Sequence, residues 1–403
     1  MSLRDTGGPL RERGFRLLWA GRTISELGSA LVPVALTFAV LDLSRSATTL
    51  GLVLAAAFVP RVVLLLPGGV FADRLPRRLV VLVTDLVRAV SQALVAFLLL
   101  SGQAQVWQLI LLFFVYGAAD AFFSPASTGL VPEVVSSKRF QQANALLSLS
   151  ASIALIAGPA LAGVLVAAWG PGVVFAVDAA TFAVSSLALA LLGGFRRHAA
   201  TAAGSGVVAD LQAGWHEVAG RSWVWTSIAY FSLSNLAVAP LFVLGPVVAK
   251  ESLGGPEAWG LILMGVGIGS LLGDAAALVL RPRRALMPGY LALATWSLAP
   301  LLLAHRSSPV AVAAAGALGF AALSFSNALW LTTLQERIPR RSLSRVSAYD
   351  WLGSRLFQPI GYALAGPAGA AFGIPATLVA GAVVHASASL AVALSPAIRN
   401  VRR

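Results

Sequence analysis

The sequence predicts an all-α integral membrane protein, with twelve transmembrane helices in two pseudo-symmetric bundles of six. Of its 403 residues, 58% are hydrophobic and only 11% are charged, whereas a soluble domain carries about 25% charged residues. The apolar residues fall into twelve runs, each close to the roughly 20 residues that a membrane-spanning helix needs. The longest break between runs, residues 195–222, follows the sixth and divides the spans six and six.

The expected spans follow from the apolar runs in chain order. They cover residues 15–42, 49–72, 79–100, 107–131, 142–169, 172–194, 223–249, 258–280, 286–304, 309–334, 345–371 and 375–396. Two positions repeat at an interval of 200 residues in corresponding spans: Gly69 with Gly269, and Pro159 with Pro359. Duplicated halves of this kind are typical of transporter architectures.

The positive charges predict how the chain is oriented. The loops form two sets that alternate along the chain. One set holds only Arg45, Lys250 and Arg306 of the 29 Lys and Arg residues, and most of the others lie in the second set. Cytoplasmic loops carry the excess of Lys and Arg, so both termini and the central loop are expected in the cytoplasm. Arginine outnumbers lysine 27 to 2, a bias of GC-rich bacterial genomes. We therefore expect a multi-pass protein of the bacterial inner (cytoplasmic) membrane.

The same break defines the expected domains. Residues 1–195 form the first bundle, 196–222 a cytoplasmic linker, and 223–403 the second bundle. Within the linker Val208, Leu211, Trp215 and Val218 recur at helical spacing. They predict an amphipathic helix that lies either in the membrane interface or packed on the bundle.

Several classes of site are not supported. There is no cysteine, which excludes disulfides and thiolate metal sites, and no two of the four histidines have metal-ligand spacing. The glycine-rich run 265–269 lacks the Lys-Ser/Thr of a phosphate-binding loop. The net charge of +13 sits in short loops and is topological. We expect no metal, no cofactor, no nucleic acid and no catalysis, so any transport must be secondary.

A charged loop separates the second and third spans. Gly69, Asp73 and Arg74 close the second span, and Arg77, Arg78 and Asp85 open the third. Residues Gly69 to Arg78, GVFADRLPRR, resemble the signature G-x-x-x-D-R-x-G-R-R of the major facilitator superfamily, with Pro76 where glycine is usual. Proline also closes tight turns.

Further segments resemble the branch of that superfamily that contains macrolide and siderophore exporters. They are Pro60-Arg61, Ser124-Pro125-Ala126, Val131-Pro132, Ala143-Asn144-Ala145-Leu146, Phe175-Ala176-Val177-Asp178-Ala179, Gln335-Glu336, Arg345-Val346-Ser347 and Pro359-Ile360-Gly361. They cover nearly the whole chain in the expected order. The resemblance implies a secondary transporter that works by alternating access, and it does not encode the substrate.

The fifth span is similar to the antiporter signature of the same family. Gly158, Pro159 and Gly163 match it, and alanines at 154 and 162 replace two glycines. In the family this signature accompanies export. The alternative is ordinary packing of small residues, which let helices approach closely.

Four spans of the first half carry charges deep in the membrane: Arg22 and Glu26, Arg61, Asp120, and Asp178. A charge at the bilayer centre costs about 2.5–3.5 kcal/mol on insertion scales, so these groups should face a cavity or a partner. Our hypothesis is that Glu26 and Asp120 exchange protons, with Arg61 nearby. The alternative is fixed ion pairs, Arg61 with Asp120 or Arg22 with Glu26. Asp178 is a further candidate or a structural tie.

The second half is poorer in deep charge. Asn235 and Asn327 are its central polar groups, and apolar lining is expected from Phe231, Phe242, Trp296, Phe320, Phe325 and Trp330. Together with the deep carboxylates of the first half, this lining would make an acidic, aromatic cavity, which suits a bulky, amphipathic and possibly cationic substrate.

The loop arginines, with Asp73 and Asp85, are expected to form a cytoplasmic gate. We predict that Asp73 lies near the start of the eleventh span and that Asp85 offers Arg74 or Arg78 a partner. Asp350 and Arg355 are assigned to the same gate. The alternative is that the loop arginines only set topology.

Three functions remain open from the sequence. The first is proton-coupled export of a small amphipathic molecule, such as a drug, antibiotic or siderophore, by a monomer in the lipid bilayer. The second is import on the same fold. The third is a sensor or assembly factor that does not transport.

Overall fold

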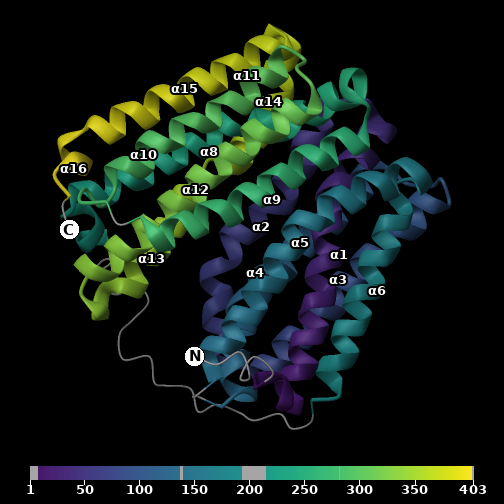
Figure 1. Cartoon of the computed structure of the whole chain (residues 1–403). Helices are drawn as coiled ribbons and strands as arrows, with labels where there is room; N and C mark the ends of the chain where they lie inside the picture. Colours follow the sequence, from purple (N-terminus) through teal and green to yellow (C-terminus); the bar gives the residue numbers. More distant parts are fainter. Residues whose placement is uncertain (1–7, 137–138, 193–214, 281, 402–403) are drawn as a thin grey trace. The chain divides into compact units, whose positions relative to one another are not determined.

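The computed structural model is helical throughout the part that it describes, residues 8–136, 139–192, 215–280 and 282–401. The side chains at 65–74, 340, 341, 344 and 345 lie outside this description. Within the described residues, eleven helices are long and apolar enough to cross a membrane. The elements run from α1 near the N-terminus to α16 near the C-terminus (Figure 1).

The helices cluster into two compact units. The first comprises residues 1–45 and 56–201, and the second residues 46–55 and 202–403. The division between 201 and 202 lies inside the expected linker. Each unit is described separately.

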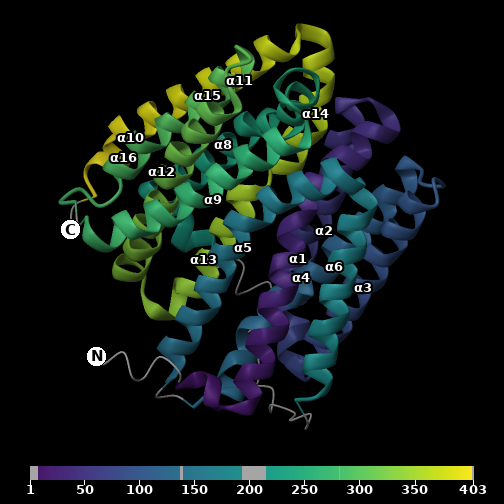
Figure 2. The same cartoon turned by 45° about the vertical axis from the view of Figure 1, so that its right-hand side comes forward.

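After a short 3-10 turn, η2 (Pro9–Arg11), the first unit contains five long helices and, from residue 56 on, most of a sixth, α2. They are α1 (Arg13–Ser44), α2 (Ala47–Arg74), α3 (Arg77–Leu100), α4 (Val106–Val134), α5 (Phe140–Trp169) and α6 (Pro171–Ala190). Helix α6 packs against both α1 and α3, while α1 also packs on α5 and α3 on α4 (Figure 2). The inward faces of α1, α3, α4, α5 and α6 therefore share one core.

An exposed carboxylate ties the start of α1 to the connection between α4 and α5. Glu12 accepts hydrogen bonds from the Ser136 amide at 3.1 Å and hydroxyl at 2.9 Å, and from Arg139 Nη1 at 3.0 Å. Desolvation opposes ionisation, but these hydrogen bonds and the Arg139 charge hold the pKa of Glu12 below its usual value.

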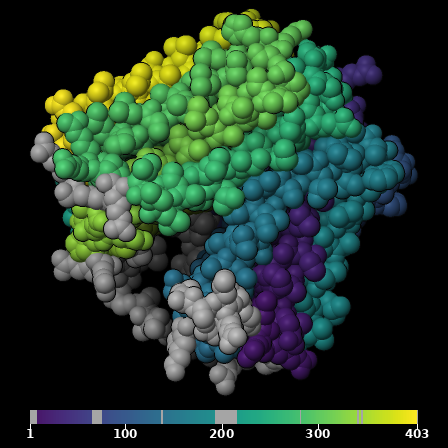
Figure 3. Space-filling view, viewed as in Figure 1, coloured from purple at the N-terminus to yellow at the C-terminus, as the bar shows by residue number. Residues whose placement is uncertain are grey.

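The second unit has more and shorter elements. They are α8 (Ser222–Val248), the π-helical turn η4 (Ala249–Leu253), α9 (Pro256–Val279), α10 (Met287–Leu293), the 3-10 turn η5 (Ala294–Ser297), α11 (Leu298–Ala304), α12 (Pro309–Arg337), α13 (Arg340–Arg355), α14 (Gln358–Phe372), α15 (Ile374–Leu394) and α16 (Pro396–Arg399). Helices α9 and α12 pack together, as do α14 and α15 on α8. Helix α15, yellow in Figure 3, lies at the surface and exposes Val383, Val384, Leu390 and Leu394, as expected of a lipid-facing helix.

Two expected spans are interrupted in the structure. The run 345–371 is two helices, α13 and α14, which meet at residues 356 and 357. Pro359 lies in the first turn of α14, and proline lacks the N–H that would continue the ladder from α13. The run 286–304 contains the 3-10 turn η5, which tightens the helix at Trp296.

The expected amphipathic helix of the linker lies mostly outside the described residues, since 193–214 are not described. Residues 215–219 are helical. Val218 is buried in the core of the second unit, and the exposed Trp215 ring lies 6.0 Å from that of Tyr349. This turn therefore packs on the bundle.

Candidate functional site

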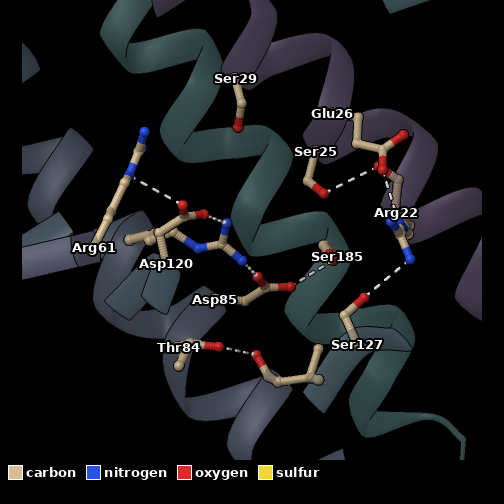
Figure 4. A network of polar contacts seen from close by, with 12 residues as sticks. Arg22, Ser25, Glu26, Ser29, Arg61, Thr84, Asp85, Asp120, Ser127 and Ser185 are labelled. Carbon is tan, nitrogen blue, oxygen red and sulfur yellow. Dashed lines mark hydrogen bonds and ion pairs between the residues drawn. The ribbon is translucent and has the colours of Figure 1, made fainter. Parts of the chain in front are cut away.

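A chain of charged side chains crosses the first unit (Figure 4). Asp120 on α4 lies between two arginines: Arg61 Nε is 3.1 Å from its Oδ2, and Arg88 Nη1 is 3.5 Å from its Oδ1. Arg88 also forms an ion pair with Asp85 one turn earlier on α3. The Ser185 hydroxyl on α6 donates to Asp85 at 2.7 Å. Side chains from four helices thus form one connected network.

Arg88 occupies a position that sequence reasoning did not single out. Its guanidinium carbon lies 3.8 Å from the ring centroid of Phe123 and 4.5 Å from that of Phe182. These aromatic contacts, together with the two carboxylates, compensate for the loss of solvent around a buried cation. The available signal was the i, i+3 spacing of Asp85 and Arg88, which places them on one helix face.

The two parts of the network differ in how far their side chains are covered by protein. The side chains of Arg88 and Asp85 are 5% and 1% exposed, whereas those of Arg61 and Asp120 are 33% and 32% exposed. Asp120 is therefore held from one side by a buried arginine and from the other by an accessible one. If Asp120 became neutral, Arg88 would keep Asp85, while Arg61 would retain the Tyr116 ring at 5.9 Å.

The second deep carboxylate lies on α1. Arg22 Nε is 2.7 Å from Glu26 Oε1, and Arg22 Nη1 donates to the Ser127 hydroxyl on α4 at 3.0 Å. Ser127 lies seven residues after Asp120, which is two helical turns, so both clusters contact the same face of α4. Both ion pairs expected from the sequence, Arg61 with Asp120 and Arg22 with Glu26, are present.

Asp178 on α6 is fully buried and joins three helices. Gln92 Nε2 on α3 donates to its Oδ2 at 2.6 Å, and the Ser29 hydroxyl on α1 lies 3.5 Å from its Oδ1. These contacts support the structural tie that the sequence left open beside a role in proton exchange.

The antiporter-like segment of α5 packs on α1. Gly158, Pro159 and Gly163 are buried. A Cβ atom at Gly158 would lie 2.9 Å from the backbone carbonyl carbon of Ala30 and would clash with the Ala30 side chain. Only glycine permits this approach of the two backbones.

The loop arginines bind inside the first unit. Arg77 donates to the Gly129 carbonyl of α4 at 2.9 Å, and Arg78 donates to the Leu189 and Ala190 carbonyls of α6, both at 2.8 Å. Arg78 thereby places positive charge at the C-terminal end of α6, where it suits the helix dipole, and Arg77 ties the start of α3 to α4. Asp85, expected beside this loop, is instead engaged by Arg88 and Ser185 in the core.

The remaining expected gate residues of that loop are not described. Gly69, Asp73 and Arg74 lie among the residues whose side chains are outside the description. Their role therefore stays a prediction.

The second unit contains a cavity of about 400 Å³. Asn235, Asn327, Asp350 and Arg355 all line it, so residues expected in a binding cavity and residues expected at a gate share one site. Of the six aromatic residues expected as lining, five are present: Phe231, Phe242, Trp296, Phe320 and Trp330.

The polar lining is held by specific hydrogen bonds. Asp350 accepts from Trp330 Nε1 at 2.9 Å and from the Ser354 hydroxyl at 3.2 Å. Asn235 Nδ2 donates to the Phe231 and Ser354 carbonyls at 3.0 and 2.9 Å. Asn235 thereby ties α8 to α13.

His385 on α15 is a buried polar residue that sequence reasoning passed over. Its Nε2 lies 3.0 Å from the Leu293 carbonyl and its Nδ1 3.0 Å from the Ser234 hydroxyl. A carbonyl only accepts, so Nε2 carries the hydrogen and Nδ1 accepts from Ser234. Leu293 immediately precedes η5, and His385 therefore anchors the interrupted ninth span. A single histidine in an apolar run carries no sequence signal for this partner.

A sequence model described as Major Facilitator Superfamily matches residues 18–361. The chain belongs to this superfamily. Membership confirms the resemblance of the loop signature and the expectation of a membrane transporter.

Relatives within the superfamily include efflux proteins. The multidrug efflux pump Tap of Mycolicibacterium fortuitum is 28% identical over 395 residues, covering 93% of this chain and 92% of Tap. Macrolide efflux protein A of Streptococcus pyogenes is 25% identical over 178 residues, 44% of either chain. An uncharacterised transporter of Bacillus subtilis, YfiS, is 30% identical over 182 residues, 45% of this chain and 42% of YfiS. The last two matches thus span less than half of those relatives.

Solved structures of superfamily transporters share the fold. A bacterial homologue of the human lysosomal transporter Spinster, in an inward-facing and unoccupied conformation, superimposes with a TM-score of 0.73 at 15% identity, covering 98% of this chain and 99% of the homologue. The nucleoside transporter NupG gives a TM-score of 0.73 at 13% identity, covering 93% of this chain and 98% of NupG. At these identities the likeness concerns the fold alone.

Proposed function

We propose that this transporter exports a small amphipathic molecule in exchange for protons, with Asp120 as the principal proton-exchanging group and Glu26 as the second. The observation that carries the proposal is the position of Asp120 between an accessible and a buried arginine. A carboxylate with two cationic partners can lose one of them without leaving a buried charge unpaired.

The proposed cycle uses the difference between the two arginines. Protonation of Asp120 releases Arg61, whose side chain is 33% exposed, while Arg88 stays paired with Asp85. Movement of Arg61 back towards Asp120 favours the ionised carboxyl and expels the proton. Glu26, whose ion pair is with Arg22 and whose side chain is 24% exposed, would exchange protons by releasing that single arginine.

Export, rather than import, is supported by two observations. The relatives Tap and macrolide efflux protein A are efflux proteins, and α5 carries the antiporter-like segment packed on α1. We further propose that the protein acts in the inner membrane with both termini in the cytoplasm, as a monomer and without enzymatic activity or a cofactor. The two six-helix domains, 1–195 and 223–403, would move about the linker 196–222 during alternating access.

The test is accumulation of radiolabelled erythromycin in energised inverted membrane vesicles, a macrolide chosen because of the efflux relatives. Export predicts uptake into these vesicles that collapses when an uncoupler removes the proton gradient. Uptake that persists without the gradient would refute proton coupling, and accumulation only in right-side-out vesicles would favour import.

Variants separate coupling from structure. Asp120→Asn should abolish accumulation against a gradient and retain exchange of internal for external erythromycin, because exchange needs no net proton movement. Glu26→Gln should act in the same direction, and the exposed Glu251→Gln serves as a control that should match the wild type. Full uphill transport by Asp120→Asn would overturn the assignment, whereas loss of folded protein would favour a fixed ion pair.

A further inference from the structure

The wall that α12 contributes to the second-unit cavity contains one amide among apolar side chains. Phe320, Leu323, Trp330 and Leu331 line the cavity from this helix, and Asn327 lies between them. The spacing follows the helical repeat, so the five side chains form one stripe. Placing an amide in an apolar stripe is costly unless it finds a hydrogen-bond partner.

Asn327 has unused hydrogen-bonding capacity. Among the described residues its amide has no protein partner, and its side chain is exposed at the cavity wall. The second asparagine of the lining differs, because the Asn235 side-chain amide already donates hydrogen bonds to the Phe231 and Ser354 carbonyls. Asn327 is therefore available to a bound molecule.

Aromatic rings surround this amide. Trp296 from η5 packs against Phe320 with ring centroids 4.3 Å apart and the ring planes tilted by 46°. Two contacts hold the backbone at Trp296 in place. A Cβ atom at Gly319 would lie only 2.7 Å from the Trp296 Cα, and His385 hydrogen-bonds the Leu293 carbonyl just before η5. The walls are thus preformed and suit flat, apolar rings.

The charges of the lining do not favour a cationic ligand. Both oxygens of Asp350 accept hydrogen bonds, from Trp330 and Ser354, and Arg355 contributes a positive charge to the same wall. Two further lining atoms without a partner, Trp296 Nε1 and Gln358 Oε1, are buried and uncharged. The lining groups named here that lack a hydrogen-bond partner are therefore all uncharged.

We propose that this cavity binds an uncharged aromatic part of the transported molecule, with the Asn327 amide donating to a carbonyl-type oxygen. The inference rests on the transport function proposed above and names the chemistry that one subsite recognises. At about 400 Å³ the cavity lies within the range of small-molecule sites. Asn327 then determines specificity, and the aromatic rings supply the apolar contact.

The experiment is equilibrium binding of three matched probes to the full-length protein in nanodiscs, corrected for partition into empty nanodiscs. Benzophenone carries two phenyl rings and a carbonyl, diphenylmethane lacks the oxygen, and protonated benzhydrylamine replaces it with a cation. We expect benzophenone to bind roughly three- to tenfold more tightly than diphenylmethane, the range of one net hydrogen bond, and more tightly than the ammonium probe.

Variants of α12 assign the preference to one side chain. Asn327→Leu should remove the preference for benzophenone and leave diphenylmethane binding within about twofold. Asn327→Asp should instead gain affinity for the ammonium probe, which a misfolded protein would not show. Thr332→Val is the matched control, because Thr332 bonds the Ala328 carbonyl of its own helix and does not line the cavity.

Several results would overturn the proposal. Equal binding of benzophenone and diphenylmethane by the wild type overturns the proposal, as does a carbonyl preference that survives Asn327→Leu. Tightest binding of the ammonium probe by the wild type overturns the neutral assignment. If Asn327→Leu does not fold, the Asn327→Asp variant and photolabelling of the wild type by benzophenone test the proposal instead. Labelling confined to sites outside the second unit would contradict the proposal. The assay uses no gradient, so a failure of proton coupling leaves its result unaffected.

Discussion

Burial distinguishes the two arginines that share Asp120. Arg88 lies between Phe123 and Phe182 and forms a second ion pair with Asp85, whereas the Arg61 side chain is partly exposed. A buried pair is costly to break because the surviving charge has no solvent, while a partly exposed pair is worth about 0–1 kcal/mol. The two arginines therefore differ in setting, and the proposed exchange assigns a structural role to Arg88 and a mobile one to Arg61.

A double-mutant cycle tests this difference. Arg88→Leu leaves Asp85 charged and buried, so we expect a loss of about 3–5 kcal/mol in the free energy of unfolding. The double variant Asp85→Leu with Arg88→Leu should lose much less than the sum of the two single variants. Arg61→Leu should cost under about 1 kcal/mol. Denaturant unfolding in mixed micelles, followed by tryptophan fluorescence, measures all four, and additive losses would contradict the pairing.

At the scale of elements, small residues decide how closely the helices of the first unit approach. Gly158 on α5 lies against the backbone of α1 at Ala30, and the neighbouring Ala154 and Ala162 are buried as well. The antiporter-like pattern thus has a packing role in the structure. That role does not compete with export, since helices that slide past each other also need close and smooth contact.

Substitution at Gly158 tests the packing. Gly158→Leu should push α1 and α5 apart and lower the unfolding temperature, because overpacking of a well-packed contact costs about 1–3 kcal/mol. Ala151→Leu, at an exposed position of the same helix, should leave the unfolding temperature near that of the wild type. Equal effects of the two leucines in thermal unfolding would show that the contact does not limit stability.

At the scale of the whole molecule, the charge pattern predicts the topology. Most arginines lie in one alternating set of loops, and the structure shows local contacts for some of them, such as Arg77 and Arg78 on helix carbonyls. The two explanations are compatible, since a cation that orients insertion can afterwards bind helix carbonyls.

Labelling of single cysteines tests the orientation, and the absence of native cysteine removes background. We expect a membrane-impermeant maleimide to label Ser101→Cys and Ser307→Cys in intact cells, because both lie in loops assigned to the outer side. Ser2→Cys and Ser205→Cys should react only after the cells are opened. Labelling of Ser2→Cys in intact cells would reverse the assigned topology.

Agreement between sequence and structure depends on how local a property is. The apolar runs predicted the long helices, but not the breaks at η5 or between α13 and α14. The break at η5 lies in apolar sequence, where hydropathy does not register a change in hydrogen bonding. The other follows the polar helix α13, which carries Asp350 and Arg355. The pairs Arg61–Asp120 and Arg22–Glu26 were the alternative to proton exchange at Asp120 and Glu26, and both pairs are present. Arg88 and His385 were missed because their importance lies in partners from other helices.

By itself the sequence determined the membrane class, the helical content, the expected orientation and the family. These follow from composition, run length and motifs, which are sums over neighbouring residues. Only the tertiary structure decided that Asp120 has two arginines, that Asp85 belongs to the core of the first unit, and that Asn327 lies among aromatic rings in a cavity. Each of these depends on which face a helix turns towards its neighbours, and that rotation is set by packing between segments far apart in the chain.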